Sequence, residues 1–127
     1  MNTHRAVSAY KEALFENASP LGVVQMMYGG ALRFLRQAKE VGGDRDRGRF
    51  NERVHRADAI VCELRHSLDR ERAPELVANL SSLYLFAEER MRTAVLQHDT
   101  RPLDEAIEVL EKLLDGWKAV DGGVAAP

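Results

Sequence analysis

The chain has 127 residues, of which 45% are hydrophobic, 30% charged and 6% aromatic, and its formal net charge is −2. This length is enough for one domain with its own core, and the charge excludes binding to nucleic acid or an anionic membrane through an overall positive field. The single cysteine, Cys62, excludes an internal disulfide, and no segment approaches the roughly 20 continuous apolar residues of a membrane-spanning helix.

The first 16 residues have neither the continuous apolar run nor the processing site of a secretory signal, so we expect a cytoplasmic protein. Tyr10, Leu14 and Phe15 recur at helical spacing. Three such residues are enough for a short helical segment but too few for a core helix. We therefore expect residues 1–16 to dock on the main domain as a capping segment.

The next segment predicts a helix over residues 20–41 that is apolar on more than one side. Ser19 is a good N-cap, and Pro20 suits the first helical position. One face has apolar residues at 3–4 spacing: Leu21, Val24, Tyr28, Ala31, Leu35 and Ala38. A second set widens this stripe: Val23, Met26, Met27, Gly30 and Phe34. Such a helix is either sandwiched or held ready for a partner. Gly29 and Gly30 each cost about 1 kcal/mol relative to alanine, which indicates that something approaches the backbone closely.

Three further helices are predicted over residues 50–69, 74–98 and 102–120, separated by breaks rich in glycine, proline and charge. Their apolar residues recur at 3–4 spacing throughout, and no segment alternates as a strand would. Connections this short make neighbouring helices antiparallel. The sequence therefore predicts an all-α, antiparallel up-down four-helix bundle over residues 17–120, followed by a disordered tail over residues 121–127.

Residues that could support chemistry are few. The pairs Glu52–His55 and Glu63–His66 have the spacing of di-metal ligands, but both lie on the predicted second helix, whereas such a centre draws its pairs from two helices. Cys62 and His66 could share a helical face, yet no oxyanion hole or orienting group is recognisable. We expect no catalytic residue, metal ion or cofactor.

Arginines cluster where the second helix begins: Arg45, Arg47, Arg49, Arg53 and Arg56. Asp44, Asp46 and Glu52 interrupt this cluster, and no aromatic residues are interleaved to stack on bases. We interpret this cluster as the charged, solvent-exposed start of the second helix and not as a nucleic-acid site.

Several motifs, in order, resemble the FliS family of flagellar secretion chaperones. Residues 18–21, A-S-P-L, with residues 26–31, M-M-Y-G-G-A, resemble the family's first-helix signature A-S-P-x-x-L-x-x-M-L-Y-D-G-A. Residues 79–84, N-L-S-S-L-Y, resemble its signature N-L-S-x-L-Y, and residues 113–118 resemble its leucine-rich helix that closes on tryptophan. Tyr10 looks like the tyrosine of the family's N-terminal segment. Gly29 stands where the family usually has aspartate.

This resemblance implies a binding protein with a defined client. FliS-family chaperones hold the C-terminal segment of flagellin, which is disordered before assembly, and so prevent premature polymerisation and deliver flagellin to the type III export apparatus. The family is also linked to an export-gate subunit and to the anti-sigma factor. The resemblance implies neither a nucleic-acid partner nor membrane insertion.

The expected client-binding residues are Tyr10, Leu14, Ser19, Pro20, Leu21, Val24, Met27, Tyr28, Gly30, Ala31, Phe34, Ile60, Leu110, Leu114 and Trp117. An alternative reading is a homodimeric structural or regulatory bundle without a flagellin client, in which Met27 and Phe34 lie in a symmetric interface. A weak homodimer is also compatible with the chaperone reading. A carboxylate metal bundle is the enzyme alternative, and it requires bound iron or manganese.

Overall fold

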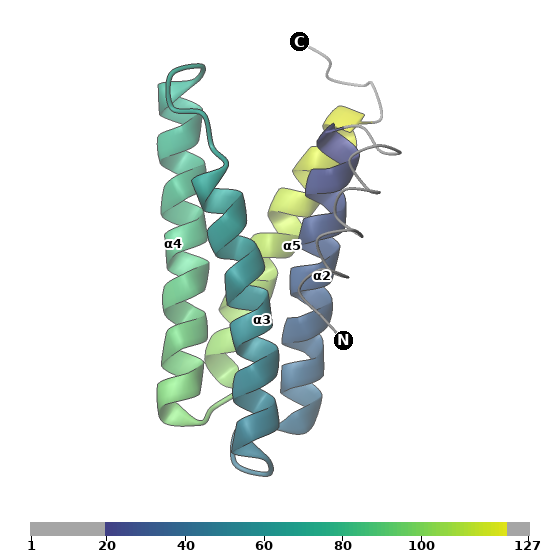
Figure 1. Ribbon diagram of the computed structural model, residues 1–127, viewed down its shortest axis with the longest axis vertical. Coiled ribbons are helices and arrows are strands. Elements are labelled where there is room, and N and C mark those ends of the chain that lie inside the picture. The colour runs from purple at the N-terminus through teal and green to yellow at the C-terminus, as the bar shows by residue number, and fades with distance from the viewer. Residues whose placement is uncertain (1–19, 122–127) are drawn as a thin grey trace, which may run out of the picture.

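The computed structural model describes residues 20–121 of the protein. The described chain forms α2 (Pro20–Val41), α3 (Arg47–His66), α4 (Pro74–Gln97) and α5 (Arg101–Asp121), and it contains no strand. Successive helices run in opposite directions along the long axis (Figure 1). This confirms the predicted all-α, up-down four-helix bundle.

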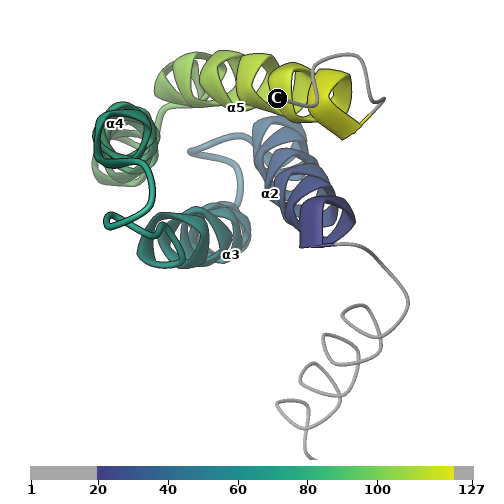
Figure 2. The ribbon, with the colours of Figure 1, turned by 90° about the horizontal axis from the view of Figure 1, so that it is seen from above.

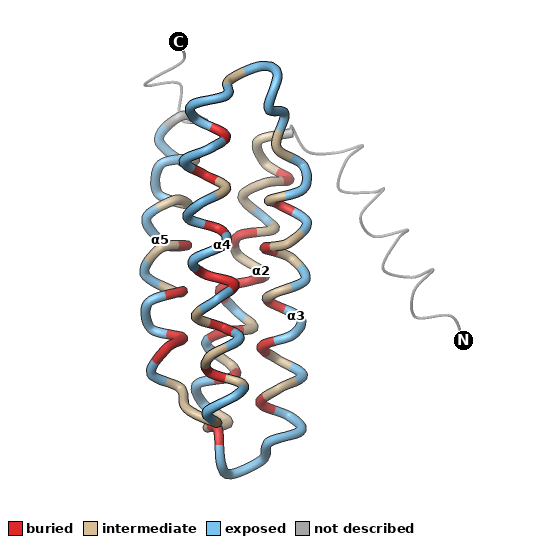
Figure 3. The backbone as a smooth tube through the Cα atoms, turned by 90° about the vertical axis from the view of Figure 1, so that its left-hand side faces the viewer, coloured by how far each residue is buried: buried red, intermediate tan, exposed pale blue. Residues whose placement is uncertain are grey.

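The four helices form a ring in chain order. Helix α2 packs against α3 and α5, and α4 also packs against α3 and α5, so α2 and α4 lie at diagonally opposite corners (Figure 2). The buried residues lie on the inward sides of the helices (Figure 3). The core set is Tyr28, Ala31, Leu32, Leu35, Ala38, Phe50, Val54, Ala57, Val61, Leu64, Leu80, Tyr84, Ala87, Met91, Ala94, Leu103, Ala106 and Leu110.

The helix limits differ from the prediction at α3 and at the C-terminus. Helix α3 begins at Arg47, not near residue 50, because the Asp46 carboxylate accepts the backbone N–H of Arg49 at 3.1 Å and caps the helix early. It ends at His66, where the backbone N–H of Ser67 bonds to the Glu63 carbonyl at 3.0 Å. Asp121, expected in the tail, is the last residue of α5.

The loops α2–α3 and α4–α5 meet at one end of the bundle. A Cβ atom added to Gly43 would lie 1.9 Å from the carbonyl oxygen of His98, so only glycine fits there. Gly42 has a φ of +80°, and its N–H bonds to the Ala38 carbonyl at 3.0 Å, as expected for a glycine that ends a helix. The close approach of Gly43 to His98 and the Gly42 hydrogen bond together fix the end of α2 and the direction in which α3 starts.

Candidate protein-binding surface

Helix α2 has two apolar faces, and the residues that the structure places on each face differ in part from those predicted. The inward face includes Leu32, which the periodicity missed, whereas Leu21 and Val24 from the predicted seam are only half-buried. Val23, assigned to the second face, is buried but lies outside the main core cluster. The inward arc is wide enough to include Leu32, one position beyond the strict 3–4 pattern.

The second apolar face of α2 points toward α3 and contains Gly30. A Cβ atom added to Gly30 would lie 3.4 Å from Ile60 Cδ1 on α3, so the two helices approach closely there. One turn further, the ring of Phe34 lies among the guanidinium groups of Arg33, Arg53 and Arg56, whose Cζ atoms are 5.9–6.0 Å from the ring centroid. Met27, Phe34 and Ile60 are all half-buried, so the α2–α3 seam presents apolar surface to solvent.

Gly29 has a different environment from Gly30. Apart from its chain neighbours and the backbone of α2 itself, no heavy atom of the described residues lies within 4 Å of a Cβ atom added to Gly29, so this turn of α2 has open space beside it. The Gly29→Ala variant is expected to raise the free energy of unfolding by about 0.5–1 kcal/mol, because alanine restricts the unfolded chain and meets no clash. Urea denaturation measures this gain, with Gly30→Ala as the comparison; its gain is expected to be smaller because of Ile60. Destabilisation by Gly29→Ala would contradict the open environment.

A network of hydrogen bonds inside the bundle joins α2, α4 and α5. The Tyr28 and Tyr84 hydroxyl groups are hydrogen-bonded to each other, and their ring centroids are 6.2 Å apart. The indole N–H of Trp117 on α5 donates to the Tyr28 hydroxyl at 3.1 Å. Because α2 and α4 are diagonal neighbours, the tyrosine pair ties together helices whose backbones do not meet. The tyrosines of the two quoted signatures are thus direct partners.

This network predicts a loss of stability at high pH. Burial is the main reason that the pKa values of Tyr28 and Tyr84 lie above the ordinary 10.0. The unfolded chain therefore releases these protons first, so the stabilisation is complete below about pH 10 and declines above it. Urea denaturation at a series of pH values between about 9 and about 11 measures the free energy of unfolding. It should fall with pH more steeply for the wild type than for Tyr28→Phe/Tyr84→Phe, by roughly 1 kcal/mol per pH unit. Equal slopes would show that the pair does not control this dependence.

The structure sorts the expected client-binding residues into three groups. Tyr28, Ala31 and Leu110 are fully buried in the core, so in this arrangement they support the surface without forming it. The half-buried residues are Leu21, Val24, Met27, Gly30, Phe34, Ile60, Leu114 and Trp117. Tyr10, Leu14 and Ser19 lie outside the described residues, as does the capping segment 1–16, and Pro20 is the first residue of α2.

Helix α4 adds exposed apolar residues that the sequence reasoning missed. They lie on either side of its buried seam: Leu76, Leu83, Leu85, Phe86 and Leu96. Leu76 is 55% exposed and Leu96 is 73% exposed. The signal was present, because these large side chains fall outside the 3–4 pattern of the predicted core.

The Cys62–His66 pair does not form a nucleophile and base. The Cys62 sulfur lies 3.4 Å from His66 Nδ1, but that nitrogen is also 2.8 Å from the Cys62 carbonyl oxygen. A carbonyl only accepts, so Nδ1 donates its proton there and has no lone pair for the thiol. Among the side chains of residues 21–119, no three from His, Cys, Asp or Glu gather closely enough to hold a metal ion. Across the same residues, no helix has the length and hydropathy required of a membrane span.

Comparisons with known proteins agree on one family. Residues 2–124 match the family model described as "Flagellar protein FliS". Two relatives named flagellar secretion chaperone FliS are similar to the chain: one from Campylobacter jejuni, 32% identical over 94% of both chains, and one from Bacillus subtilis, 31% identical over 87% of this chain and 82% of the relative. Flagellar secretion chaperone FliSB from Pseudomonas aeruginosa is 33% identical over 86% of both chains. A bacterial flagellar chaperone crystal structure has the same fold, with a TM-score of 0.76, 17% identity and coverage of 93% of this chain and 98% of that one.

Proposed function

The chain belongs to the FliS family of flagellar secretion chaperones, and we propose that it holds the disordered C-terminal segment of flagellin in the cytoplasm until export. In this proposal, binding prevents premature polymerisation and delivers flagellin to the type III export apparatus. The observation that supports it most is the excess of apolar surface along α2 and α4 in a bundle whose core is already complete. The proposed activity is non-covalent and requires no catalytic group, metal ion or cofactor.

The proposed binding mode is helix docking along the bundle. A flagellin segment with apolar residues at i, i+3 and i+4 would form short helices and bury these side chains against the α2–α3 seam and the flanks of α4. Ordering such a segment costs about 2–5 kcal/mol, and each fully buried large apolar side chain contributes about 1.5–3 kcal/mol. Several anchors are therefore needed, which favours a client that contacts both surfaces. Met26 and Met27 suit a surface that adapts to different side chains.

We further propose that residues 1–16 cover part of this surface when no client is bound, through Tyr10, Leu14 and Phe15. Flagellin would then displace the cover. Deleting residues 1–16 is expected to preserve or tighten flagellin binding, because the competing segment is gone. Loss of binding by a truncated chain that keeps its helical circular dichroism spectrum would refute the cover.

An export-gate subunit and the anti-sigma factor are additional proposed partners, and they rest on family membership alone. The alternative of a homodimer without a flagellin client would bury Met27 and Phe34 between two copies. Sedimentation of the free and flagellin-bound protein separates these cases, since the chaperone proposal requires a complex with one copy of each chain.

Polymerisation of flagellin tests the proposal. Flagellin from the same organism, seeded with filament fragments, is followed by light scattering with and without an equimolar amount of this protein. We expect growth to be suppressed, because the segment needed for assembly is held by the bundle. An unrelated helical protein at the same concentration is the control. Unchanged growth in the presence of the folded protein would reject the proposed function.

A further inference from the structure

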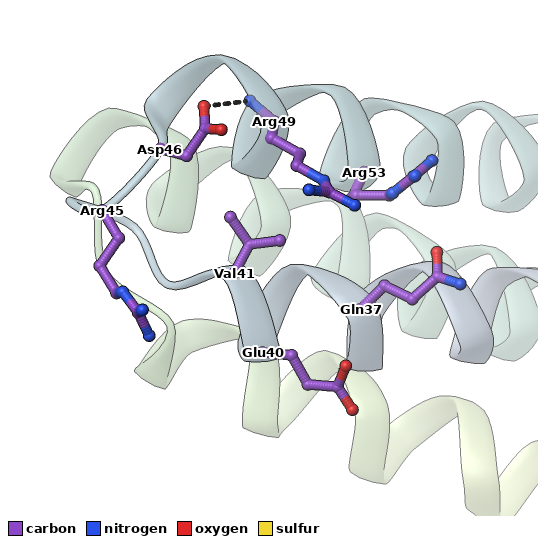
Figure 4. A pocket seen from close by; sticks show the side chains of 7 residues that line it. All are labelled: Gln37, Glu40, Val41, Arg45, Asp46, Arg49 and Arg53. Carbon is purple, nitrogen blue, oxygen red and sulfur yellow. Dashed lines mark hydrogen bonds between the residues drawn. The ribbon is translucent and has the colours of Figure 1, made fainter.

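A row of arginines lines a cleft at the end of the bundle where α2 passes into α3. The cleft has a volume of about 530 Å³ and is lined by Gln37, Glu40, Val41, Arg45, Asp46, Arg49 and Arg53 (Figure 4). Arg49 and Arg53 lie one turn apart on α3, and Arg45 lies in the preceding loop at the other end of the cleft, with its side chain extending away from theirs (Figure 4). We call Arg45, Arg49 and Arg53 the arginine row.

The positive charge of this row is only partly neutralised. Glu52 pairs with Arg53 at 2.9 Å and also with Arg56 at 3.0 Å, so one carboxylate serves two guanidinium groups. Asp46 is occupied by the N–H of Arg49 as a helix cap. Neither Arg45 nor Arg49 forms an ion pair with any side chain among residues 21–119. Glu40 extends from α2 away from Arg49 and Arg53 (Figure 4).

An unpaired polar atom and one ring contact also bear on ligand binding at this cleft. The Gln37 side-chain oxygen is buried at the cleft and has no hydrogen-bond partner among the described residues, so it is an acceptor for an N–H group of an incoming partner but not for a carboxylate. The Arg53 guanidinium is held against the Phe34 ring, 6.0 Å from its centroid. A side chain fixed in this way loses less freedom on binding.

From this geometry, we propose that the arginine row binds an acidic helical segment of a partner protein, with carboxylates one turn apart. A helix rises about 6 Å over four residues, so glutamates at i and i+4 on the partner match Arg49 and Arg53, and a further carboxylate at the end of that segment meets Arg45 in the loop. A compact anion would engage only part of such a row. A nucleic-acid backbone is held through many phosphate contacts, whereas this cleft offers only three arginines. This inference goes beyond the proposed flagellin-binding function and does not depend on it.

A nuclear magnetic resonance titration of the full chain tests the inference. The probe is a capped 16-residue alanine-based peptide with glutamate at about every fourth position, which places the carboxylates along one helical side. The comparison peptide has the same composition with its glutamates dispersed around the helix. We expect saturable shifts at the amides of Arg45, Arg49 and Arg53 with the first peptide, weaker binding of the second, and an affinity that falls as salt rises.

Charge variants show whether the row is responsible. Arg45→Glu/Arg49→Glu is expected to weaken binding at least about tenfold, whereas Arg70→Glu/Arg72→Glu, an equal charge change in the α3–α4 loop, should change it less than about twofold. Arg45→Gln/Arg49→Gln provides a milder substitution if charge reversal disturbs the start of α3. No saturable shifts, equal effects of the two reversals, or equal or tighter binding of inorganic phosphate or oligouridylate at the same amides would each overturn the inference.

Discussion

Replacing Arg65 with alanine is expected to lower the free energy of unfolding by about 3 kcal/mol, near the lower end of values for breaking a buried ion pair. Glu88 on α4 is only 6% exposed, and its carboxylate accepts two N–H bonds from Arg65 on α3, at 2.7 and 3.2 Å. The Arg65 side chain is 23% exposed, so solvent moderates the effect. Without Arg65, the buried carboxylate has lost its cation while remaining largely out of water. Urea denaturation at neutral pH measures the loss.

The matched control removes both charges. Arg65→Met/Glu88→Leu is expected to be much closer to the wild type than Arg65→Ala, because no charge is left unpaired and the apolar side chains fill similar space. If the double variant were as unstable as Arg65→Ala, packing of the arginine stem and not the ion pair would explain the loss. If Arg65→Ala had no effect, the Glu88 carboxylate would have to be solvated in solution.

Replacing Ile60 with glutamate is expected to weaken binding of the flagellin C-terminal segment by about 30-fold or more, equivalent to about 2 kcal/mol. Ile60 is half-buried and lies directly opposite Gly30, where α2 and α3 approach and apolar surface meets solvent. A carboxylate there would be desolvated by a docked apolar side chain without gaining a partner. Isothermal titration calorimetry with the segment measures the loss.

The control for this variant is Ala59→Glu, which adds the same charge to the adjacent exposed position. It is expected to bind the segment within about twofold of the wild type, because the neighbouring position lies about 100° around the helix. Circular dichroism confirms that both variants are folded. Equal binding by Ile60→Glu and wild type would place the client away from the α2–α3 seam.

The fold could be predicted because the apolar period recurs in every helix and the breaks are well marked. In α4, the apolar residues at 3–4 spacing are all buried: Val77, Leu80, Tyr84, Ala87, Met91 and Ala94. Phe50 was missed as a core residue because the predicted helix began there, whereas the Asp46 cap starts α3 earlier and brings this side chain into the core. Periodicity thus locates the core face of a helix well, but its ends depend on local capping contacts.

The candidate surface was less predictable because the contacts that hold its helices together join residues that are distant in sequence. Tyr28 bonds to Tyr84 across 56 positions and to Trp117 across 89. No helical period encodes such pairs, nor the pairing of Arg65 with Glu88. The exposed leucines of α4 were overlooked for a simpler reason. Apolar residues at 3–4 spacing identify the buried face of a helix. They do not show that large apolar residues outside this spacing, such as Leu83 and Phe86, remain exposed.

The central claim is that this bundle binds the C-terminal segment of flagellin, and titration of the full chain with a peptide of roughly the last 40 flagellin residues tests it most directly. We predict saturable one-to-one binding, a gain of helical circular dichroism by the peptide and a negative change in heat capacity, because an unfolded apolar segment becomes ordered on an apolar surface. A peptide with the same composition in scrambled order should not bind. Absence of saturable binding, with the chain fully folded, would contradict the account.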